Sequence, residues 1–395
     1  MIRFINFLTE ASITDTTKLS HLDHAASLAM HPEHFDRAHT FLSQMHGMIQ
    51  GNSKPPEGFT EKKDGGMSIV MFRHPESGKV GVGYKTSVFA KTPKLNYSAD
   101  DIQRNHGTSP HVVDALNQAL EHAPKILPKG NGKKAPFYQG DILFKRGDVK
   151  QGGGKVSYQP NVIKYTHDTS SPEGKLVKQS NFGIHIHTGY EDTGKGEWPH
   201  SLSANYSTNF SKLNHSPDVF VTTPGYHGNA SYHEGEKEKV DGHLKRAKEL
   251  SDTLSPAEHS VIHSHYDHLN SYVNQTKREG STPSHAGYIE HLNAKAQKDV
   301  DSVKTEKSKL AKKEKWGAIA NEATKNKQTI ETALNIQSHH QAATDVMTKA
   351  LDRGLNRETE GYMGTVNGNA LKAIHTSVTK RIANNAKFRP ESKND

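Results

Sequence analysis

The spacing of apolar residues divides the chain into segments of different character. From Thr17 to Gln50, apolar residues recur every three or four positions on two successive faces, as in amphipathic helices. Pro32 separates the two faces, at a position where proline is tolerated in the first turn of a new helix. Pro55 and Pro56 end this segment. The pattern therefore predicts a helical N-terminal segment.

A strand-rich region follows, in which short apolar runs are separated by glycine-rich loops. Residues 67–72 and 80–84 flank the turn sequence His74–Gly78 and predict a β-hairpin. Ser109–Pro110 is typical of a helix start, and apolar residues at helical spacing follow it. The other predicted strands are residues 137–144, 161–165, 182–187 and 218–222. Short strands of this kind predict an antiparallel α+β domain.

From about Glu236 to Arg353 the apolar residues return to helical spacing, among many Lys, Glu and Gln residues. Breaks at Gly280–Pro283 and around Trp316–Gly317 predict at least two helical hairpins within this block. Strand character returns at Glu360–Val366. The expected architecture is a sheet domain with a large helical insertion.

Composition limits the classes of function. Only 32% of the 395 residues are hydrophobic and the mean hydropathy is -0.81, so the core must be thin for the length. No apolar run approaches the length of a membrane span, so we expect no membrane partner. The absence of cysteine excludes disulfides, thiolate zinc sites and cysteine nucleophiles. A net charge of +8 favours an anionic partner such as nucleic acid, although lysine-rich helices are often simply solvated.

The most informative motif is Glu61-Lys62-Lys63-Asp64-Gly65, just before the predicted hairpin. A lysine becomes a nucleophile only as the free amine, which costs on the order of 4 kcal/mol at neutral pH when its pKa is about 10.4. Neighbouring cations lower that cost, and Lys63, Lys85, Lys372 and a bound metal ion are candidates. The glycine pair Gly65-Gly66 permits the close backbone approach that a nucleotide pocket requires. The alternative interpretation is a solvated turn between two strands.

Five later positions follow this motif in a recognisable order. They are Lys85 in Tyr84–Phe89, Asp141 in Tyr138–Phe144, His187 in Phe182–His187, Glu360 in Arg357–Met363 and Lys372 in Asn369–Ile374. With K-x-D-G at Lys62, the series resembles the motifs of the covalent nucleotidyltransferase superfamily, which includes ATP-dependent RNA and DNA ligases and mRNA-capping enzymes. The sequence departs from that pattern twice, because Asp141 replaces the usual Glu and Lys372 stands alone where K-x-K is usual. The resemblance covers about Gly58–Arg381 outside the helical block. The order of K-x-D-G, Q-G-D and E-G, together with the start Phe4–Glu10, also looks like a little-characterised protein family in large tailed phages.

The resemblance implies an ATP-dependent polynucleotide (RNA or DNA) ligase-like nucleotidyltransferase. Lys62 would attack the α-phosphate of ATP to form a lysyl-AMP intermediate, with Mg²⁺ as the metal and nucleic-acid ends as the acceptor. RNA is slightly favoured over DNA, because few residues follow Lys372 and the barrel appended to DNA ligases has no room there. The implied nucleotide-binding residues are Glu61, Asp64, Gly65, Lys85, Asp141, His187, Glu360 and Lys372, with Asp141 and Glu360 as metal ligands.

The implied fold is α+β, an antiparallel-sheet nucleotidyltransferase domain (ATP-grasp-like ligase type) with an N-terminal helical segment and a large helical insertion. The implied division is 1–10, a candidate head-targeting propeptide; 11–56, the helical segment; 57–235, the first part of the core; 236–353, the insertion; and 354–395, the last part of the core and a tail. Two alternatives stay open: a nucleotidyltransferase with another acceptor, and a virion or internal head protein that binds DNA through a degenerate ligase fold.

The first ten residues carry a separate signal. They resemble the head-targeting peptides of T4-type internal head proteins, which are cleaved after Leu/Ile-x-Glu, matched here by Leu8-Thr9-Glu10. This resemblance implies a phage head scaffold and a prohead protease as partners. It also implies a location in the host cytoplasm or packaged in the phage head. A plain N-terminal helix or strand is the alternative.

Histidine is abundant, with 27 residues. His185 and His187 alternate along one predicted strand, and His263, His265 and His268 lie on one predicted helix. Imidazole pairs at such spacings can bind zinc or copper. Because no third, acidic ligand stands at a matching distance in the sequence, we expect His187 to line the nucleotide pocket and the helical histidines to be solvated.

Overall fold

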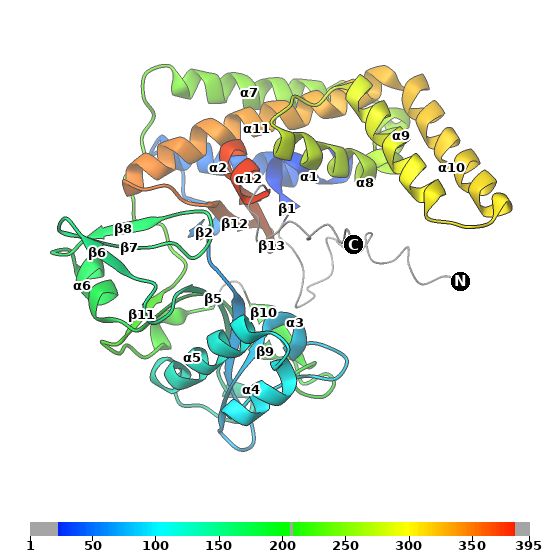
Figure 1. Cartoon of the computed structure of the whole chain (residues 1–395). Coiled ribbons are helices and arrows are strands. Elements are labelled where there is room, and N and C mark those ends of the chain that lie inside the picture. The colour runs from blue at the N-terminus through cyan, green and yellow to red at the C-terminus, as the bar shows by residue number, and fades with distance from the viewer. Residues whose placement is uncertain (1–22, 206–207, 384–395) are drawn as a thin grey trace. The chain divides into compact units, whose positions relative to one another are not determined.

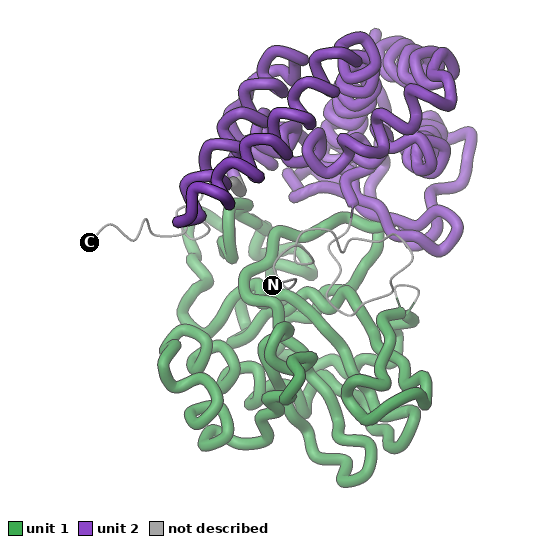
Figure 2. Tube along the Cα trace, turned by 90° about the vertical axis from the view of Figure 1, so that its right-hand side faces the viewer, with its two compact units in different colours: residues 1–21, 60–226 green, residues 22–59, 227–395 purple. Residues whose placement is uncertain are grey.

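The computed structural model describes residues 23–205 and 208–383, so the candidate head-targeting peptide, residues 1–10, lies outside the described residues. The chain forms two compact units, one from Thr60–Tyr226 and the other from Leu22–Phe59 and His227–Asp395 (Figure 2). Each unit has its own hydrophobic core and at least one sheet. The α+β class predicted from the sequence is confirmed.

The first unit is built on a sheet of order β10-β9-β5-β3-β4, in which neighbouring strands run antiparallel. A further strand, β11, pairs parallel to β9. The strands are β3 (Ser68–Arg73), β4 (Val80–Tyr84), β5 (Phe137–Phe144), β9 (Phe182–Asp192), β10 (Leu202–Asn205) and β11 (Val219–Thr222). The predicted hairpin is confirmed, since Val70 of β3 pairs with Gly83 of β4.

Strand β3 is buried on both faces of this sheet. Successive side chains alternate, so Ile69 and Met71 face one side while Val70 and Phe72 face the other, and all four are buried. The helices α4 (Ala99–His106) and α5 (Pro110–Ile126) cover the face of Ile69 and Met71 (Figure 1). Val88 of the short helix α3 (Lys85–Val88) packs with Val70 and Phe72 on the opposite face. This double burial explains the unbroken apolar run in the sequence.

A second, three-stranded antiparallel sheet completes this unit. It contains β6 (Lys150–Gly152), β7 (Lys155–Tyr158) and β8 (Tyr165–Asp168), next to the helix α6 (Pro172–Gln179). Short 3₁₀ turns occur at Gly132–Lys134 and Phe210–Lys212. The predicted strand at 161–165 was wrong, because β8 begins only at Tyr165. The amides of Val162 and Ile163 donate instead to the Asp64 carboxylate.

The second unit is mainly helical and carries a sheet of order β1-β13-β12-β2. Its strands are β1 (Asp23–His24), β2 (Glu57–Lys62), β12 (Gly361–Val366) and β13 (Asn369–Ala373), and β2 continues into the first unit after Phe59. Its helices are α1 (Ala25–Leu28), the 3₁₀ turn η1 (Pro32–His34), α2 (Phe35–Ile49), α7 (Glu236–Asp252), α8 (Pro256–Glu279), α9 (His285–Asp301), α10 (Glu306–Lys325), α11 (Lys327–Leu355) and α12 (Thr376–Ala383). Among the described helices, none has an apolar stretch that could cross a bilayer.

The helical block differs from its prediction at one break. The break at Gly280–Pro283 is confirmed, with Gly280 in the left-handed conformation that ends α8. The predicted break at Trp316–Gly317 was wrong, because α10 continues through both residues. The Trp316 indole N–H donates to Asp299 at 3.0 Å, and the space beside Gly317 is open, so nothing there interrupts the helix.

The C-terminal strands β12 and β13 do not belong to the compact unit in which we expected them. We expected residues 354–395 to complete the sheet domain, but β12 and β13 belong to the unit that contains the helical block. The reason lies in strand pairing, since β13 pairs with β12 on one side and parallel to β1 on the other. The N-terminal segment and the C-terminal strands therefore share one sheet.

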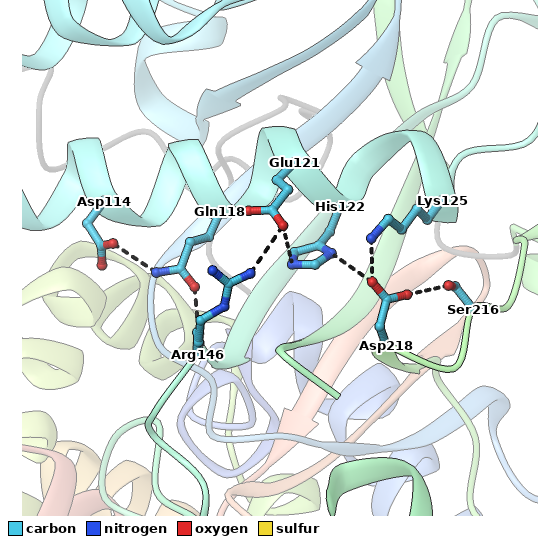
Figure 3. Close-up of polar contacts among 8 residues, drawn as sticks. All are labelled: Asp114, Gln118, Glu121, His122, Lys125, Arg146, Ser216 and Asp218. Atoms are coloured by element: carbon cyan, nitrogen blue, oxygen red, sulfur yellow. Dashed lines mark hydrogen bonds and ion pairs between the residues drawn. The ribbon is translucent and has the colours of Figure 1, made fainter. Parts of the chain in front are cut away.

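A polar network joins α5 to the start of β11 in the first unit (Figure 3). The Asp218 carboxylate accepts hydrogen bonds from Lys125 and from the Ser216 hydroxyl, and these two contacts lower the pKa of Asp218 to about 2. The buried His122 ring stacks on Phe182 and lies 3.9 Å from the same carboxylate. The network thus attaches α5, which covers the sheet, to the start of β11.

We predict that Asp218→Asn lowers the free energy of unfolding at pH 7 by about 1 kcal/mol, because it removes a charge-assisted but partly exposed pair. Since the folded-state pKa is depressed, this stabilisation is complete above the unfolded pKa of about 3.9 and is lost as the pH falls towards about 2. Urea unfolding at several pH values measures the difference. Glu121→Gln removes a more exposed charge from the same network and should cost less than about 0.5 kcal/mol. Equal losses in the two variants would contradict this account.

Candidate nucleotide-binding site

Lys62 is the last residue of β2 and stands at the start of the loop that leads to β3. Along an extended chain successive side chains alternate, so Glu61 and Lys63 share a side and Lys62 projects to the other. Glu61 and Lys63 are both buried and form an ion pair of 3.0 Å, with the Lys63 ammonium 5.2 Å from the centre of the Tyr165 ring. Lys62 is only partly buried. The local chain therefore places Lys63 in the interior and Lys62 at a partly exposed position.

Asp64 anchors the loop that follows Lys62. Its side chain is 1% exposed, and its carboxylate accepts hydrogen bonds from Asn161 Nδ2 at 2.7 Å and from the amides of Val162 and Ile163 at 2.5 and 2.6 Å. The Asp64 amide donates to the Tyr165 hydroxyl at 2.8 Å. A buried carboxylate is stable only when its oxygens are satisfied in this way. Asp64, predicted to bind the nucleotide, thus holds the loop against the 161–165 segment.

Gly65 brings the same loop into contact with β5. A Cβ atom at Gly65 would lie 2.2 Å from Cβ of Asp141, a distance that real Cβ atoms do not reach. The next amide, of Gly66, donates to the carbonyl of Ile142 at 2.8 Å. A glycine is therefore required at position 65, and it places the K-x-D-G loop directly on the strand that carries Asp141.

Asp141 is the centre of a polar cluster on β5. It pairs across the sheet with Ser68 of β3 and with His185 of β9, and its Oδ1 lies 3.5 Å from Nε2 of His187. Burial favours the protonated acid, but the charge and hydrogen bond of His187, the charge of Lys62 and a hydrogen bond from Ser68 outweigh it and hold the pKa of Asp141 well below its ordinary value. The carboxylate is therefore ionised at neutral pH.

Two further side chains complete this cluster. Burial lowers the pKa of Lys85, while the charge of Asp141 opposes that shift, so the two groups interact. His185 is buried and its Nδ1 lies 3.0 Å from the Thr222 hydroxyl. Burial, with the charges of His187, Lys63 and Lys62, lowers the pKa of His185 far below its ordinary value, so this ring is neutral. The cluster therefore combines two lysines with one ionised carboxylate, a charge balance suited to phosphate groups.

The structure brings together only part of the predicted set. Within the first unit it gathers Lys62, Gly65, Lys85, Asp141 and His187 around one cluster, with Glu61 and Asp64 in the supporting loop. Glu360 precedes β12 and Lys372 lies on β13, so both belong to the other unit.

Near Lys372, sequence reasoning missed a buried lysine on α8. Burial lowers the pKa of Lys277 to about 8, with the charge of Asp345 opposing the shift and that of Lys372 adding to it. The Lys277 ammonium donates to the Ser27 hydroxyl at 3.2 Å. Its sequence context, a polar amphipathic helix, gave no signal of burial. Ser68 was missed because only strand pairing places it beside Asp141, and Tyr165 because its contacts with Asp64 and Lys63 join distant parts of the chain.

The first unit contains side chains that could hold phosphate oxygens and one Mg²⁺ ion. Mg²⁺ is commonly held by one or two carboxylates together with substrate phosphates, and Asp141 offers an ionised, partly exposed carboxylate. Lys62 and Lys85 supply the positive charge that phosphate oxygens require. The arrangement can therefore hold an anion next to an accessible amine.

We predict that Gly65→Ala impairs this site, because the added methyl group must displace either the loop or β5. The variant should lose about 1–3 kcal/mol of unfolding free energy, as overpacking typically costs, measured by urea unfolding. Gly152→Ala is the matched control, since no atom lies within 4 Å of a Cβ at that position. A Gly65→Ala protein as stable as the control would show that the loop does not press on Asp141.

The sequence was also compared with known proteins. A family described as a family of unknown function, DUF6267, matches residues 19–373. No curated protein and no solved structure matches the chain significantly. The family match spans both compact units and every residue of the cluster around Asp141. The chain therefore belongs to the DUF6267 family.

Proposed function

We propose that this protein is a covalent nucleotidyltransferase of the polynucleotide-ligase type, with Lys62 as its nucleophile. The observation that carries the proposal is the fixed position of the K-x-D-G loop: Asp64 anchors it, and Gly65 presses it against Asp141. A partly buried lysine at a strand end, near a second lysine and a carboxylate that could hold Mg²⁺, supports attack on a nucleotide phosphate.

In the first step the Lys62 amine, after losing a proton to solvent, attacks the α-phosphorus of ATP. A nitrogen–phosphorus bond forms, the bond from the α-phosphorus to the bridging oxygen breaks, and pyrophosphate leaves. Lys85 stabilises the negative charge on the phosphate oxygens. Asp141 is the residue of this unit that would hold Mg²⁺, which when bound offsets phosphate charge.

The acceptor in this proposal is a nucleic-acid end. An oxygen of a terminal 5′-phosphate displaces Lys62 from the adenylate, and a 3′-hydroxyl then displaces AMP and joins the two ends. The second unit supports a polyanionic acceptor, because α10 is rich in lysine and most of its residues are exposed. Glu360 and Lys372 remain predicted nucleotide ligands from that unit, Glu360 also a metal ligand.

We predict that the wild-type protein forms a covalent adduct with ATP, GTP or NAD labelled at the phosphate attached to the transferred nucleoside, in the presence of Mg²⁺. Lys62→Ala and Lys62→Arg should form none, since a guanidinium stays protonated and cannot attack. Lys91→Ala, which changes an exposed lysine of the same unit, should label fully. Denaturing gels read out the label, and thermal unfolding checks the fold. Undiminished labelling of Lys62→Ala, or no adduct with any of the three nucleotides, would overturn the proposal.

Asp141→Asn should slow adduct formation by about 100-fold, corresponding to the loss of roughly 2.7 kcal/mol of metal-assisted charge stabilisation. It should also raise the Mg²⁺ concentration needed for half-maximal rate, a change that a purely structural role would not produce. Asp100→Asn, which alters an exposed carboxylate in the first turn of α4, serves as the control. An unchanged Mg²⁺ dependence in Asp141→Asn would show that Asp141 does not bind the metal ion.

A further inference from the structure

At three places in the described part of the helical unit, two histidine rings approach to a nitrogen–nitrogen distance of 3.0 Å. The pairs are His31–His263, His39–His340 and His243–His339. The first pair is distinguished by a carboxylate. Ligand atoms of His31, Glu33 and His263 all lie within 4.8 Å of one another, and no other three-residue His, Asp or Glu group among the described residues meets this condition.

The local fold holds two of these residues across one tight turn. His31 precedes the 3₁₀ turn η1, and Pro32, with its fixed φ, stands between His31 and Glu33. His263 comes from α8, 232 positions further along the chain. The His31 ring is buried, whereas Glu33 and His263 are exposed, and the three line a surface pocket together with Pro32, His259 and Ser260. An ion can therefore reach the three side chains from solvent.

The distances suit a shared ion. Two ligands that are each about 2.0–2.1 Å from a metal lie about 2.8–3.4 Å apart at bond angles between 90° and tetrahedral. The His31 Nε2 to His263 Nδ1 distance of 3.0 Å falls in this range, and the exposed Glu33 side chain can turn to close the remaining gap. Imidazole and carboxylate together are typical ligands of zinc and related ions.

The histidine pair could also be held by a hydrogen bond between the rings. That bond accounts for one nitrogen of each ring. It gives no reason for a carboxylate at this pair, and no Asp or Glu completes such a three-ligand group at the other two pairs in the described residues.

We propose that His31, Glu33 and His263 bind a divalent transition-metal ion of the zinc type. Two imidazoles and one carboxylate fill three coordination positions, and the fourth faces the pocket and is open to water or a further ligand. The bound ion cross-links the N-terminal segment to α8, and this site is independent of the Lys62 site in the other unit.

The test uses untagged full-length protein, stripped of metal by chelator dialysis and titrated with ZnCl₂ by calorimetry. Wild-type protein should bind one equivalent saturably, and its melting temperature should rise by several degrees with excess Zn²⁺. Co²⁺ in place of Zn²⁺ should give visible absorption bands from low-coordinate cobalt.

Glu33→Gln and His263→Asn should each weaken Zn²⁺ binding by about 100-fold or more, because loss of an outer-shell partner alone costs 10–100-fold. The matched control, His243→Asn, breaks a histidine pair of equal spacing that lacks the carboxylate and should leave binding unchanged. Circular dichroism verifies that each variant is folded. Absence of one-equivalent binding in wild type, or equal affinity in wild type and both site variants, would overturn the proposal.

Discussion

The buried carboxylate of Asp64 is the interaction on which the candidate site depends. Its two oxygens accept hydrogen bonds from one side-chain amide and two backbone amides of the 161–163 segment, and nearly all of the side chain is removed from water. Leaving such a carboxylate unsatisfied would be strongly unfavourable, so the loop after Lys62 has little freedom to move away. Gly65 then allows that loop to rest on β5, where a side chain of any size would separate the two.

This anchoring gives the residues of the short motif different roles. Glu61 and Lys63 neutralise one another inside the unit, whereas Lys62 on the opposite side of the chain interacts with Asp141. Asp141 stays ionised because its interactions with His187, Lys62 and Ser68 outweigh the effect of its partial burial. The proposed chemistry depends on Lys62 and Asp141. The ion pair between Glu61 and Lys63, on the opposite side of the chain, holds the motif in place.

Much of the sheet could be predicted from the sequence, because β3, β4, β5 and β9 carry strong apolar patterns bounded by glycine and proline. The segment 161–165 could not, since its amides bind Asp64, a partner almost a hundred residues away that no local pattern indicates. Part of the site could also be predicted, because the order of motifs along the chain indicated Lys62, Lys85, Asp141 and His187. His185 and Ser68 required the register of the strands, and Glu33 required the fold that brings η1 to α8.

The central claim is that Lys62, and no other lysine of the cluster, carries the nucleotide. The most direct measurement is mass spectrometry of proteolytic fragments after incubation of the folded protein with ATP and Mg²⁺, under conditions that preserve phosphoramidates. The account predicts the mass of one AMP on the fragment containing Lys62, localised by fragmentation to that residue rather than to Lys63 beside it. AMP on Lys63 or Lys85, or complete recovery of an unmodified Lys62 fragment with ATP, GTP and NAD alike, would contradict it.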